Sequence, residues 1–526
     1  MKGYNLVGFE ESRQGTTTLN AFSTVGNTVL EGDFAVATAD EINKAIEKAG
    51  KAFRIYSKTS ALERAAFLEA IADEIMAIGD LLIERAMQES GLPEARLTGE
   101  RGRTTGQLKL FAEVLREGSW VEAVIDTTMP DRKPLPRADL RKMLVPVGPV
   151  LVFGASNFPF AFSTAGGDTA SALAAGNPVI VKAHEGHLGT NELMATAIRN
   201  AARKCNMPDG VFSCIISNDV EAIQQVVKHE GIKAIGFTGS YKAGTAIFKT
   251  ATTARKTPIP VYAEMSSINP ILVLPRKLEN DAVALAAQLV GSVTLGVGQF
   301  CTNPGLLFTI QGKATDLLIG SMTALIQKAV PATMLNKGVC SNYYNTRRTL
   351  QQQHGVETVA VVEDAEAGYK GAAALLKVAA KDFIANEELQ AEVFGPSTLI
   401  VVCKDQQELE QAVASLHGQL TGTVIGTKDD IETFSDVISV LSGKVGRLLY
   451  NGVPTGVEVC HAMVHGGPYP ATTHAGSTSV GADAIKRFAR PLCFQDCPQE
   501  FLPDALKDEN PLKIMRKING KYQIAN

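Results

Sequence analysis

The strongest candidate for covalent chemistry in this sequence is Cys301, which lies in the run GQFCTNPG at residues 298–305. A cysteine thiolate is a good nucleophile, and the glycines beside it permit a bound molecule to approach the backbone closely. Single cysteines near an apolar helix are, however, usually inert members of a core. Cys301 by itself therefore supports two interpretations, a nucleophile or a core thiol.

Three more polar residues each follow a short apolar segment with the composition of a strand. Asn157 could donate a hydrogen bond to a developing oxyanion, or could only form a turn before Pro159. Glu264 could act as a general base, or could cap the next element. Lys182 could bind a phosphate or a ribose, or could be a surface charge.

The run FTGSYKAG at residues 237–244 spans an expected junction between a strand and a helix. Gly239, Ser240 and Gly244 would there bring backbone N–H groups and a helix N-terminus towards a pyrophosphate. A tight turn that needs glycine explains the same pattern equally well. The pattern G-x-G-x-x-G of many dinucleotide sites is absent from this region of the sequence.

The elements that position these residues alternate between strand and helix. The expected elements are strand 150–153, helix 164–175, strand 178–182, helix 190–205, strand 211–216, helix 220–229, strand 232–237, helix 241–253 and strand 259–263. Such alternation predicts a parallel, doubly wound sheet, which binds ligands at the C-terminal ends of its strands. Residues 266–465 alternate in the same way, whereas residues 1–120 are expected to be mainly helical, with capping boxes at Thr38 and Ser60.

Taken in chain order, these residues closely resemble the aldehyde dehydrogenase superfamily. The series consists of Asn157, Lys182, Gly239 with Gly244, Glu264, Cys301 and the run EVFGP at residues 392–396. The resemblance extends over residues 20–495. Its most specific part is Glu264 followed 37 residues later by Cys301 in the pattern Gly-Gln-x-Cys.

The resemblance implies a catalytic role for three residues. Cys301 matches the nucleophile, and its backbone N–H matches the oxyanion hole together with the side chain of Asn157. Glu264 matches the general base. The implied reaction is NAD(P)-dependent oxidation of an aldehyde to a carboxylate through a thiohemiacetal and a thioester on Cys301.

The resemblance also implies a cofactor site. Lys182 and Glu392 match groups that hold the ribose hydroxyls, and Phe394 matches a contact to the nicotinamide end. Gly239 and Gly244 match the turn over the pyrophosphate, with Ser240 between them.

The sequence departs from the family at two places. The family usually follows its base with Leu-Gly-Gly, whereas Met265, Ser266 and Ser267 follow Glu264 here. The backbone next to Glu264 is therefore expected to swing less freely. The family commonly has Trp before the oxyanion Asn, where this chain has Ser156.

The fold implied by the resemblance is α/β, with two doubly wound parallel-sheet domains and a small β oligomerisation arm. Residues 1–121 and 144–264 would form the cofactor-binding domain, residues 265–470 the catalytic domain, and residues 122–143 and 481–500 the arm. Such an arm predicts a homodimer or a homotetramer.

Within the family, three runs resemble the bacterial 2,5-dioxopentanoate (α-ketoglutaric semialdehyde) dehydrogenases, namely FGASNFP at 153–159, VKAH at 181–184 and GGPYP at 466–470. This resemblance implies a substrate aldehyde with a distant carboxylate, oxidised to 2-oxoglutarate. A fatty or broad-range aldehyde dehydrogenase is the alternative. A cofactor-independent thiol hydrolase and a non-catalytic binding protein are less compatible with the series of residues above.

The expected substrate residues are Arg103, Gln107 and Phe158. In the family, the helix that contains Arg103 borders the substrate channel, and an arginine can bind a carboxylate through two hydrogen bonds. Gln107 lies one turn further along the same helix and would add a donor. Alternatively, Arg103 pairs with Glu100 or Glu113, or faces solvent.

The cofactor is NAD or NADP, and Glu185 favours NAD. A carboxylate at this position accepts hydrogen bonds from the ribose hydroxyls and repels a 2′-phosphate. Positive charge on Lys182, His184 and His187 would instead attract the 2′-phosphate and favour NADP.

Composition restricts the remaining functions. The 526 residues are 45% hydrophobic and 20% charged, and 51 Lys and Arg oppose 55 Asp and Glu for a net charge of −4, so neither a disordered chain nor a nucleic-acid partner is expected. The uncharged stretches 143–167 and 282–312 contain Pro, Asn or Gln, which favours buried segments over membrane spans. Eight cysteines without a C-x-x-C pair, and no visible signal peptide, predict a cytoplasmic protein without a metal site.

Overall fold

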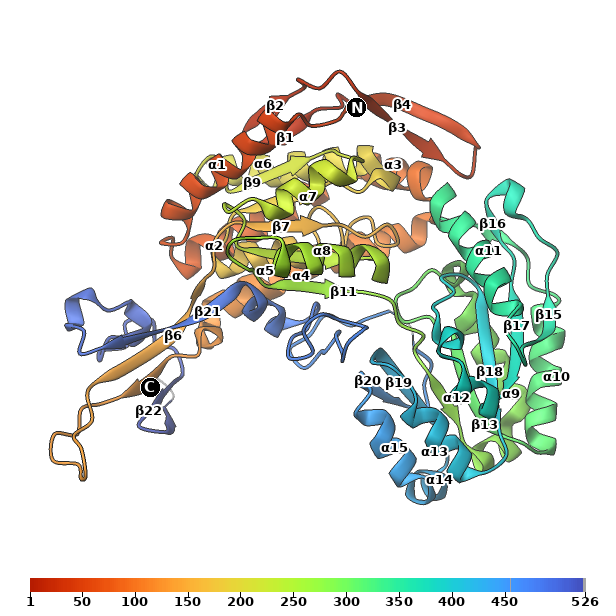
Figure 1. Cartoon of the computed structure of the whole chain (residues 1–526). Coiled ribbons are helices and arrows are strands. Elements are labelled where there is room, and N and C mark those ends of the chain that lie inside the picture. Colours follow the sequence, from red (N-terminus) through yellow and green to blue (C-terminus); the bar gives the residue numbers. More distant parts are fainter. Residues whose placement is uncertain (455, 524–526) are drawn as a thin grey trace.

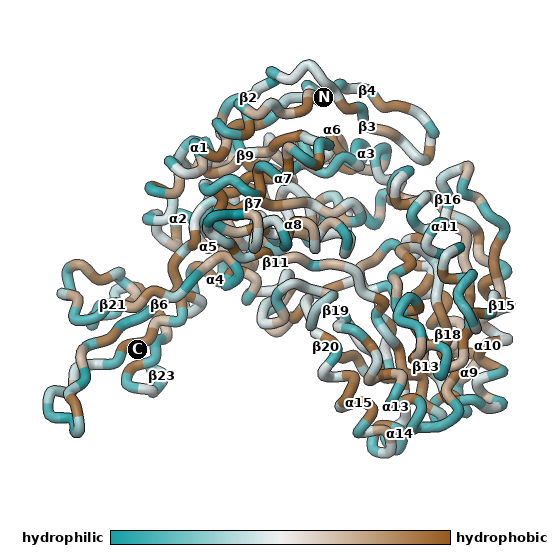
Figure 2. Tube along the Cα trace, in the orientation of Figure 1, coloured by the Kyte–Doolittle hydropathy of each residue, from teal (hydrophilic) through white to brown (hydrophobic). Residues whose placement is uncertain are grey.

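Two seven-stranded sheets and one five-stranded sheet organise the chain in the computed structural model, which describes residues 1–454 and 456–523. Figure 1 shows the first large sheet in the upper lobe, the second in the lobe at the right, and the five-stranded sheet in an arm that projects away from both. Figure 2 shows apolar stretches running through both lobes and polar residues at the tip of the arm. The predicted α/β class with two doubly wound sheets and a β arm is confirmed.

The first large sheet has the strand order β11-β10-β7-β8-β9-β1-β2, and its five strands from β7 to β11 are parallel. These strands are β7 (Val150–Phe153), β8 (Val179–Lys182), β9 (Phe212–Ile215), β10 (Ala234–Thr238) and β11 (Val261–Glu264). The helices between them are α5 (Gly167–Ala175), α6 (Leu188–Lys204), α7 (Val220–Lys228) and α8 (Tyr241–Thr253). The strands are nearly continuous apolar runs because helices cover both faces of such a sheet.

The N-terminal region differs in part from the prediction. Helices α1 (Ala39–Tyr56), α2 (Ala61–Ala77), α3 (Asp80–Ser90) and α4 (Glu94–Glu117) are present, and capping boxes at Thr38 and Ser60 begin the first two. Residues before them form short strands instead, namely β1 (Asn5–Val7), β2 (Glu10–Ser12), β3 (Thr18–Ser23) and β4 (Thr28–Ala35). The helical prediction was wrong there because β1 pairs with β2 and β3 with β4, and β1 also joins the first sheet through β9, about two hundred residues away in sequence.

The second large sheet has the strand order β15-β17-β18-β13-β12-β19-β20, and β15 is its antiparallel edge strand. Its strands are β12 (Ile271–Val273), β13 (Leu306–Ile310), β15 (Glu357–Val361), β17 (Ala374–Ala379), β18 (Ser397–Cys403), β19 (Gln419–Ile425) and β20 (Val445–Tyr450). The accompanying helices are α9 (Pro275–Thr294), α10 (Lys313–Ile326), α11 (Lys337–Gln351), α12 (Ala380–Ala385), α13 (Gln406–Ala414), α14 (Lys428–Thr433) and α15 (Ser435–Ser442).

Helix α9 and the turn after it, Pro275–Gly298, form the single stretch in the described part of the chain that is long and apolar enough to cross a membrane. Leu285 and Leu289 of α9 are buried in the same apolar cluster as Leu318 of α10 and Leu307 of β13. Helix α9 therefore packs as a core helix of the second lobe.

The arm sheet has the strand order β21-β6-β5-β22-β23. Its strands are β5 (Val124–Asp126), β6 (Leu140–Pro146), β21 (Ala489–Gln495), β22 (Arg516–Ile518) and β23 (Lys521–Gln523). The arm is thus larger than the segments 122–143 and 481–500, since β6 continues to Pro146 and the C-terminal strands join it. The short helix Ala482–Phe488 belongs instead to the first lobe, where Arg487 forms a buried ion pair of 2.5 Å with Asp168 of α5.

Candidate active site

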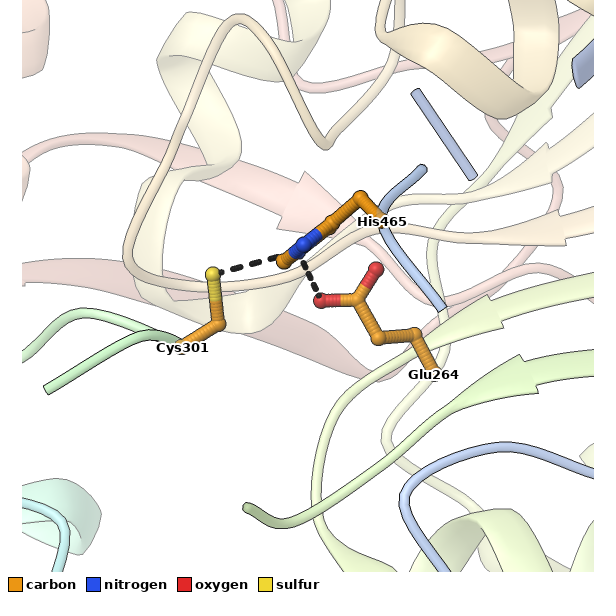
Figure 3. Close-up of side chains that lie close together, drawn as sticks. All are labelled: Glu264, Cys301 and His465. Atoms are coloured by element: carbon orange, nitrogen blue, oxygen red, sulfur yellow. Dashed lines mark hydrogen bonds and ion pairs between the residues drawn. The ribbon is translucent and has the colours of Figure 1, made fainter. Parts of the chain in front are cut away.

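Three side chains from three separate parts of the chain meet between the two lobes (Figure 3). Glu264 ends strand β11, Cys301 lies in the turn after the short helix Leu295–Gly298, and His465 lies in the irregular segment after β20. The Sγ atom of Cys301 is 3.4 Å from Nε2 of His465, and the same Nε2 is 2.9 Å from Oε1 of Glu264. Glu264 and His465 are buried, whereas Cys301 is partly accessible.

The charges in this group stabilise one another. Burial alone would lower the pKa of His465, but the charges of Glu264 and Cys301 raise that pKa to about 10. Burial alone would raise the pKa of Glu264, but the charge and hydrogen bond of His465 lower it, assisted by a 2.6 Å hydrogen bond from the Ser479 hydroxyl. At neutral pH the arrangement therefore favours a protonated imidazole beside the Glu264 carboxylate.

The geometry differs from that of a serine-type triad, in which the base uses one ring nitrogen for each partner. Here one atom, Nε2, faces both the thiol and the carboxylate, so a single proton can move among the three groups. The other ring nitrogen, Nδ1, is buried without a hydrogen-bond partner among the described residues. As an imidazolium, His465 can therefore stabilise a thiolate on Cys301 and exchange a proton with Glu264.

Sequence reasoning missed His465. It directly precedes the run GGPYP, which carried part of the resemblance, but a single histidine has no spacing that marks it as functional. One possible metal-ligand atom from each of Glu264, Cys301 and His465 lies within 4.8 Å of the other two. Among residues 1–454 and 456–523, these three side chains form the one group that could bind a metal ion.

Asn157 lies beside the nucleophile, as the resemblance implied. Its Nδ2 donates to the backbone carbonyl of Gln299 at 3.2 Å, and both Asn157 and Cys301 line one cavity. Since a side-chain amide has two N–H donors, the second can serve an oxyanion on the Cys301 side.

Arg96 positions the loop that carries Asn157. Its guanidinium lies between the rings of Phe158 and Phe300, 4.7 Å from each centroid, and donates to the backbone carbonyl of Asn157 at 2.7 Å. These contacts connect α4 to both the oxyanion residue and the turn of Cys301.

The cavity that reaches Cys301 continues along the C-terminal ends of the first sheet and has a volume of about 600 Å³. Six of the seven predicted cofactor residues line it, namely Lys182, Glu185, Gly239, Ser240, Glu392 and Phe394. The hydroxyl of Ser240 caps α8 by accepting a hydrogen bond from the N–H of Ala243, so the helix N-terminus faces the cavity. This donor set fits a dinucleotide, and the ribose contacts of Lys182 and Glu392 stay predictions.

Gly244 is the exception, because it lies inside α8 and not on the cavity wall. A Cβ at Gly244 would come within 2.6 Å of Sδ of Met265 and 3.2 Å of the Phe237 ring. The glycine therefore permits α8 to pack closely on the sheet, which corrects its predicted place over the pyrophosphate.

Glu392 has an unusual protonation equilibrium. Burial and the charge of Glu264 raise its pKa to about 7, although hydrogen bonds from the Ser266 side chain and the Ser267 backbone oppose the shift. The Ser266 hydroxyl also accepts a hydrogen bond of 3.3 Å from the backbone of Tyr241, the first residue of α8. Ser266 and Ser267, which differ from the usual family residues, thus supply hydrogen-bond partners for the Glu392 carboxylate on the cofactor side of the site.

On the substrate side, Arg103 faces inward and forms no ion pair with Glu100, Glu113 or any other described acid. Its Nε donates to the backbone carbonyl of Val457 at 3.2 Å, and its guanidinium lies 5.1 Å from the Phe162 ring. Phe162 in turn packs edge-on against the ring of His465, with centroids 6.2 Å apart. One aromatic ring therefore separates Arg103 from the reacting group.

The other two predicted substrate residues lie in different surroundings. Phe158 packs against Phe300 with ring centroids 5.7 Å apart, next to the nucleophile turn. Gln107 is buried beside Gly167, where its Nε2 would be 2.6 Å from an added Cβ, and no described contact joins it to Arg103. Its role as a substrate donor stays a prediction.

The fold and this arrangement of side chains define a family. Residues 11–489 match the family described as "Aldehyde dehydrogenase family", and the chain belongs to it. It is an NAD(P)-dependent aldehyde dehydrogenase. The chain is 50% identical over 524 residues to "Alpha-ketoglutaric semialdehyde dehydrogenase 2" of Azospirillum brasilense, covering 99% of this chain and 100% of that protein.

A second relative, the "Alpha-ketoglutaric semialdehyde dehydrogenase" of Acinetobacter baylyi, is 46% identical over 93% of this chain and 92% of its own length. Among solved structures, the methylmalonate-semialdehyde dehydrogenase of Oceanimonas doudoroffii has a TM-score of 0.78 at 19% identity, covering 95% of this chain and 99% of that one. At that identity the structural likeness supports the fold alone.

The first prediction concerns His465. Alkylation of Cys301 by iodoacetamide requires the thiolate, which the imidazolium stabilises below its pKa of about 10. The wild-type rate should rise less steeply between about pH 7 and about pH 9 than that of His465→Phe, because the imidazolium persists to about pH 10. In His465→Phe the rate should rise more than about tenfold over that range, as for a free cysteine of pKa ~8.5.

The measurement is mass spectrometry of the peptide containing Cys301, so that the other seven cysteines do not interfere. His354→Phe is the matched control because His354 lies on the surface. Parallel pH profiles in wild type and His465→Phe would contradict a role for His465 in forming the thiolate.

The second prediction concerns Asn157. Asn157→Ala removes one donor to the oxyanion, so kcat should fall by about 10²–10³-fold while cofactor affinity is retained. Steady-state kinetics and a cofactor titration measure the two quantities. Asn218→Ala, in an exposed residue on the same cavity wall, is the control. A loss confined to KM would make Asn157 a positioning residue.

Proposed function

We propose that this protein oxidises 2,5-dioxopentanoate to 2-oxoglutarate, with NAD as the preferred cofactor, in the cytoplasm. The observation that carries the substrate proposal is Arg103, a buried guanidinium with two unpartnered nitrogens one aromatic ring away from His465. The names of the two relatives, at 50% and 46% identity over nearly the whole chain, support the same substrate.

The first half of the reaction follows from the positions of Cys301, His465 and Asn157. The charged Nε2–H of His465 stabilises Sγ as a thiolate, which attacks the aldehyde carbon to give a thiohemiacetal. The side-chain amide of Asn157 donates to the oxygen that becomes negative. A bound nicotinamide supplies a hydride acceptor, which leaves a thioester on Cys301.

The second half is hydrolysis of that thioester. Glu264 is held by His465 and Ser479, one on each carboxylate oxygen, so its position is fixed before water arrives. Water loses a proton to the Glu264–His465 pair as it attacks the thioester carbon. The thiol leaves as a thiolate, and the imidazolium beside it stabilises that charge.

An anionic substrate suits the charges around the channel. Burial lowers the pKa of Arg103, and the charges of Glu100 and Cys301 partly restore it, so the group keeps its charge in a site shielded from water. A carboxylate would provide partners for Nη1 and Nη2, which are otherwise unsatisfied within the described chain. A long apolar aldehyde would leave both nitrogens without partners.

The preference for NAD rests on the surroundings of Glu185. Lys182 is paired with Glu185 at 2.9 Å, so its charge is already partly neutralised. Burial and the charge of Lys182 lower the pKa of His184 to about 3, and burial lowers the pKa of His187 well below its usual value. Both histidines are therefore neutral and offer no charge to a 2′-phosphate.

The arm supports a homodimer or a homotetramer. Its sheet ends in two open edges, at β21 and β23, and unpaired edges can bond to another chain. Leu135, Phe501 and Tyr522 of the arm region expose most of their side chains. All eight cysteines are unpaired, which is consistent with a reducing compartment.

The third prediction tests the substrate. Wild type should have a higher kcat/KM for 2,5-dioxopentanoate than for hexanal. Arg103→Met should raise KM for 2,5-dioxopentanoate by about tenfold or more, because a charged hydrogen-bonded pair is lost, and should change KM for hexanal little. Arg116→Met, an exposed residue of the same helix, is the control. A wild-type preference for hexanal would favour a fatty-aldehyde dehydrogenase instead.

The fourth prediction tests the cofactor. Glu185→Ser removes the carboxylate and frees Lys182, so the ratio of kcat/KM for NADP to that for NAD should rise by about tenfold or more. Initial rates with both cofactors at saturating aldehyde give the ratio. Glu221→Ser, in an exposed acid at the start of α7, should leave it unchanged. A wild-type preference for NADP would show that Glu185 does not act on the ribose.

A further inference from the structure

Arg447 is a second arginine at the segment that carries His465, and neither the sequence pattern nor the proposed reaction uses it. It lies on β20, the edge strand of the second sheet. Its Nη1 lies 3.7 Å from Sδ of Met463, two residues before His465. Figure 1 shows the segment after β20 passing between the two lobes.

The charge of Arg447 is held in a desolvated place. Its Nε and Nη2 are buried and have no hydrogen-bond partner in the described chain. Burial lowers the pKa of Arg447, and the charge of Cys301 is the group that offsets this effect. No acid among the described residues forms an ion pair with it. A buried guanidinium with unpaired N–H groups has lost its hydrogen bonds to water. An oxygen-bearing partner would offset that loss.

Arg447 and Arg103 border the same segment, residues 457–465, from different lobes. Arg103 reaches it through the carbonyl of Val457 and, across Phe162, the ring of His465. Arg447 reaches it through Met463. Val457 and Met463, the two residues that the arginines contact, thus belong to the same segment that ends at His465.

The free donors of the two side chains form two separate pairs. In Arg103 the free donors are Nη1 and Nη2, at the end of the guanidinium. In Arg447 they are Nε and Nη2, along one side of the guanidinium. Either pair can hold two acceptor oxygens. A simple carboxylate would occupy one pair and leave the other unsatisfied. A 2-oxocarboxylate carries three acceptor oxygens in one plane and can engage both pairs.

We propose that Arg447 is a specificity-determining residue that recognises the 2-oxo group of the substrate, while Arg103 binds the adjacent carboxylate. The proposal rests on the proposed function, since it assigns the two ends of the 2-oxocarboxylate of 2,5-dioxopentanoate. Under this assignment the site favours 2,5-dioxopentanoate over an aldehyde that has only the terminal carboxylate. A buried site built to bond an oxygen rejects an analogue that lacks it, because its own donors are left unpaired.

The test compares three aldehydes of equal chain length: 2,5-dioxopentanoate, 5-oxopentanoate, which lacks only the ketone, and pentanal, which lacks both groups. Wild type should have the highest kcat/KM for 2,5-dioxopentanoate. In Arg447→Met this value should fall by about ten- to a hundredfold, mainly through KM, with a change of less than about threefold for the other two. Arg103→Met should lower the values for both acids and spare pentanal.

Product binding gives a readout that does not depend on turnover. 2-Oxoglutarate should raise the Tm of wild type more than glutarate does, and Arg447→Met should remove this difference. Arg276→Met is the matched control because Arg276 lies exposed in the same lobe. Arg447→Lys keeps the charge without the fork and should give an intermediate discrimination. If Arg447→Met does not fold, the lysine variant alone decides the outcome.

Two results separate failure of this inference from failure of the proposed function. If wild type prefers pentanal, the proposed function is wrong and the inference falls with it. If wild type prefers the acids but Arg447→Met leaves the ratio between 2,5-dioxopentanoate and 5-oxopentanoate unchanged, only the assignment of Arg447 is overturned. An equal loss for all three aldehydes would likewise make Arg447 a structural residue.

Discussion

The active site depends on one imidazole nitrogen that faces a thiol and a carboxylate at once. Cys301 comes from the second lobe, Glu264 from the last strand of the first sheet, and His465 from the segment that returns between them. Burying the Glu264 carboxylate is unfavourable unless a cation lies beside it, and the His465 imidazolium is that cation. The docking of the two lobes is therefore what creates the nucleophile, because neither lobe contains all three side chains.

Two largely buried arginines near the active site pack against aromatic rings. Arg96 lies between Phe158 and Phe300, and Arg103 lies over Phe162. Rings provide a partial electrostatic partner for both; Glu100 also lies 4.0 Å from Arg96, whereas Arg103 has no ion pair within the described chain and keeps both Nη groups available. An acid at the same position would neutralise the charge and compete with an anionic substrate. The channel is thereby suited to aldehydes that bring their own negative charge.

Residues that depart from the family pattern support this arrangement. The hydroxyl of Ser267 lies within 3.0 Å of both Asn269 and Gln419, and Ser266 contacts Glu392 and the start of α8. Met265 donates its backbone N–H to Ala471, which fixes the chain after Glu264 against the C-terminal segment. The expectation that this backbone swings less freely agrees with these contacts. Glu264 is accordingly positioned by His465 and Ser479.

The sequence by itself determined the fold class, the five parallel strands of the first sheet, and the residues Asn157, Glu264 and Cys301, because apolar periodicity and a specific ordered series are local or one-dimensional properties. Short strands at residues 5–35 and the C-terminal strands of the arm escaped it; β1 joins the first sheet through the distant β9, and β22 joins the arm through the distant β5. Only the tertiary structure identified His465 and Arg447, and it moved Gly244 off the cavity wall. A lone histidine or arginine has no periodic signature, and its role exists only through the neighbours that folding brings to it.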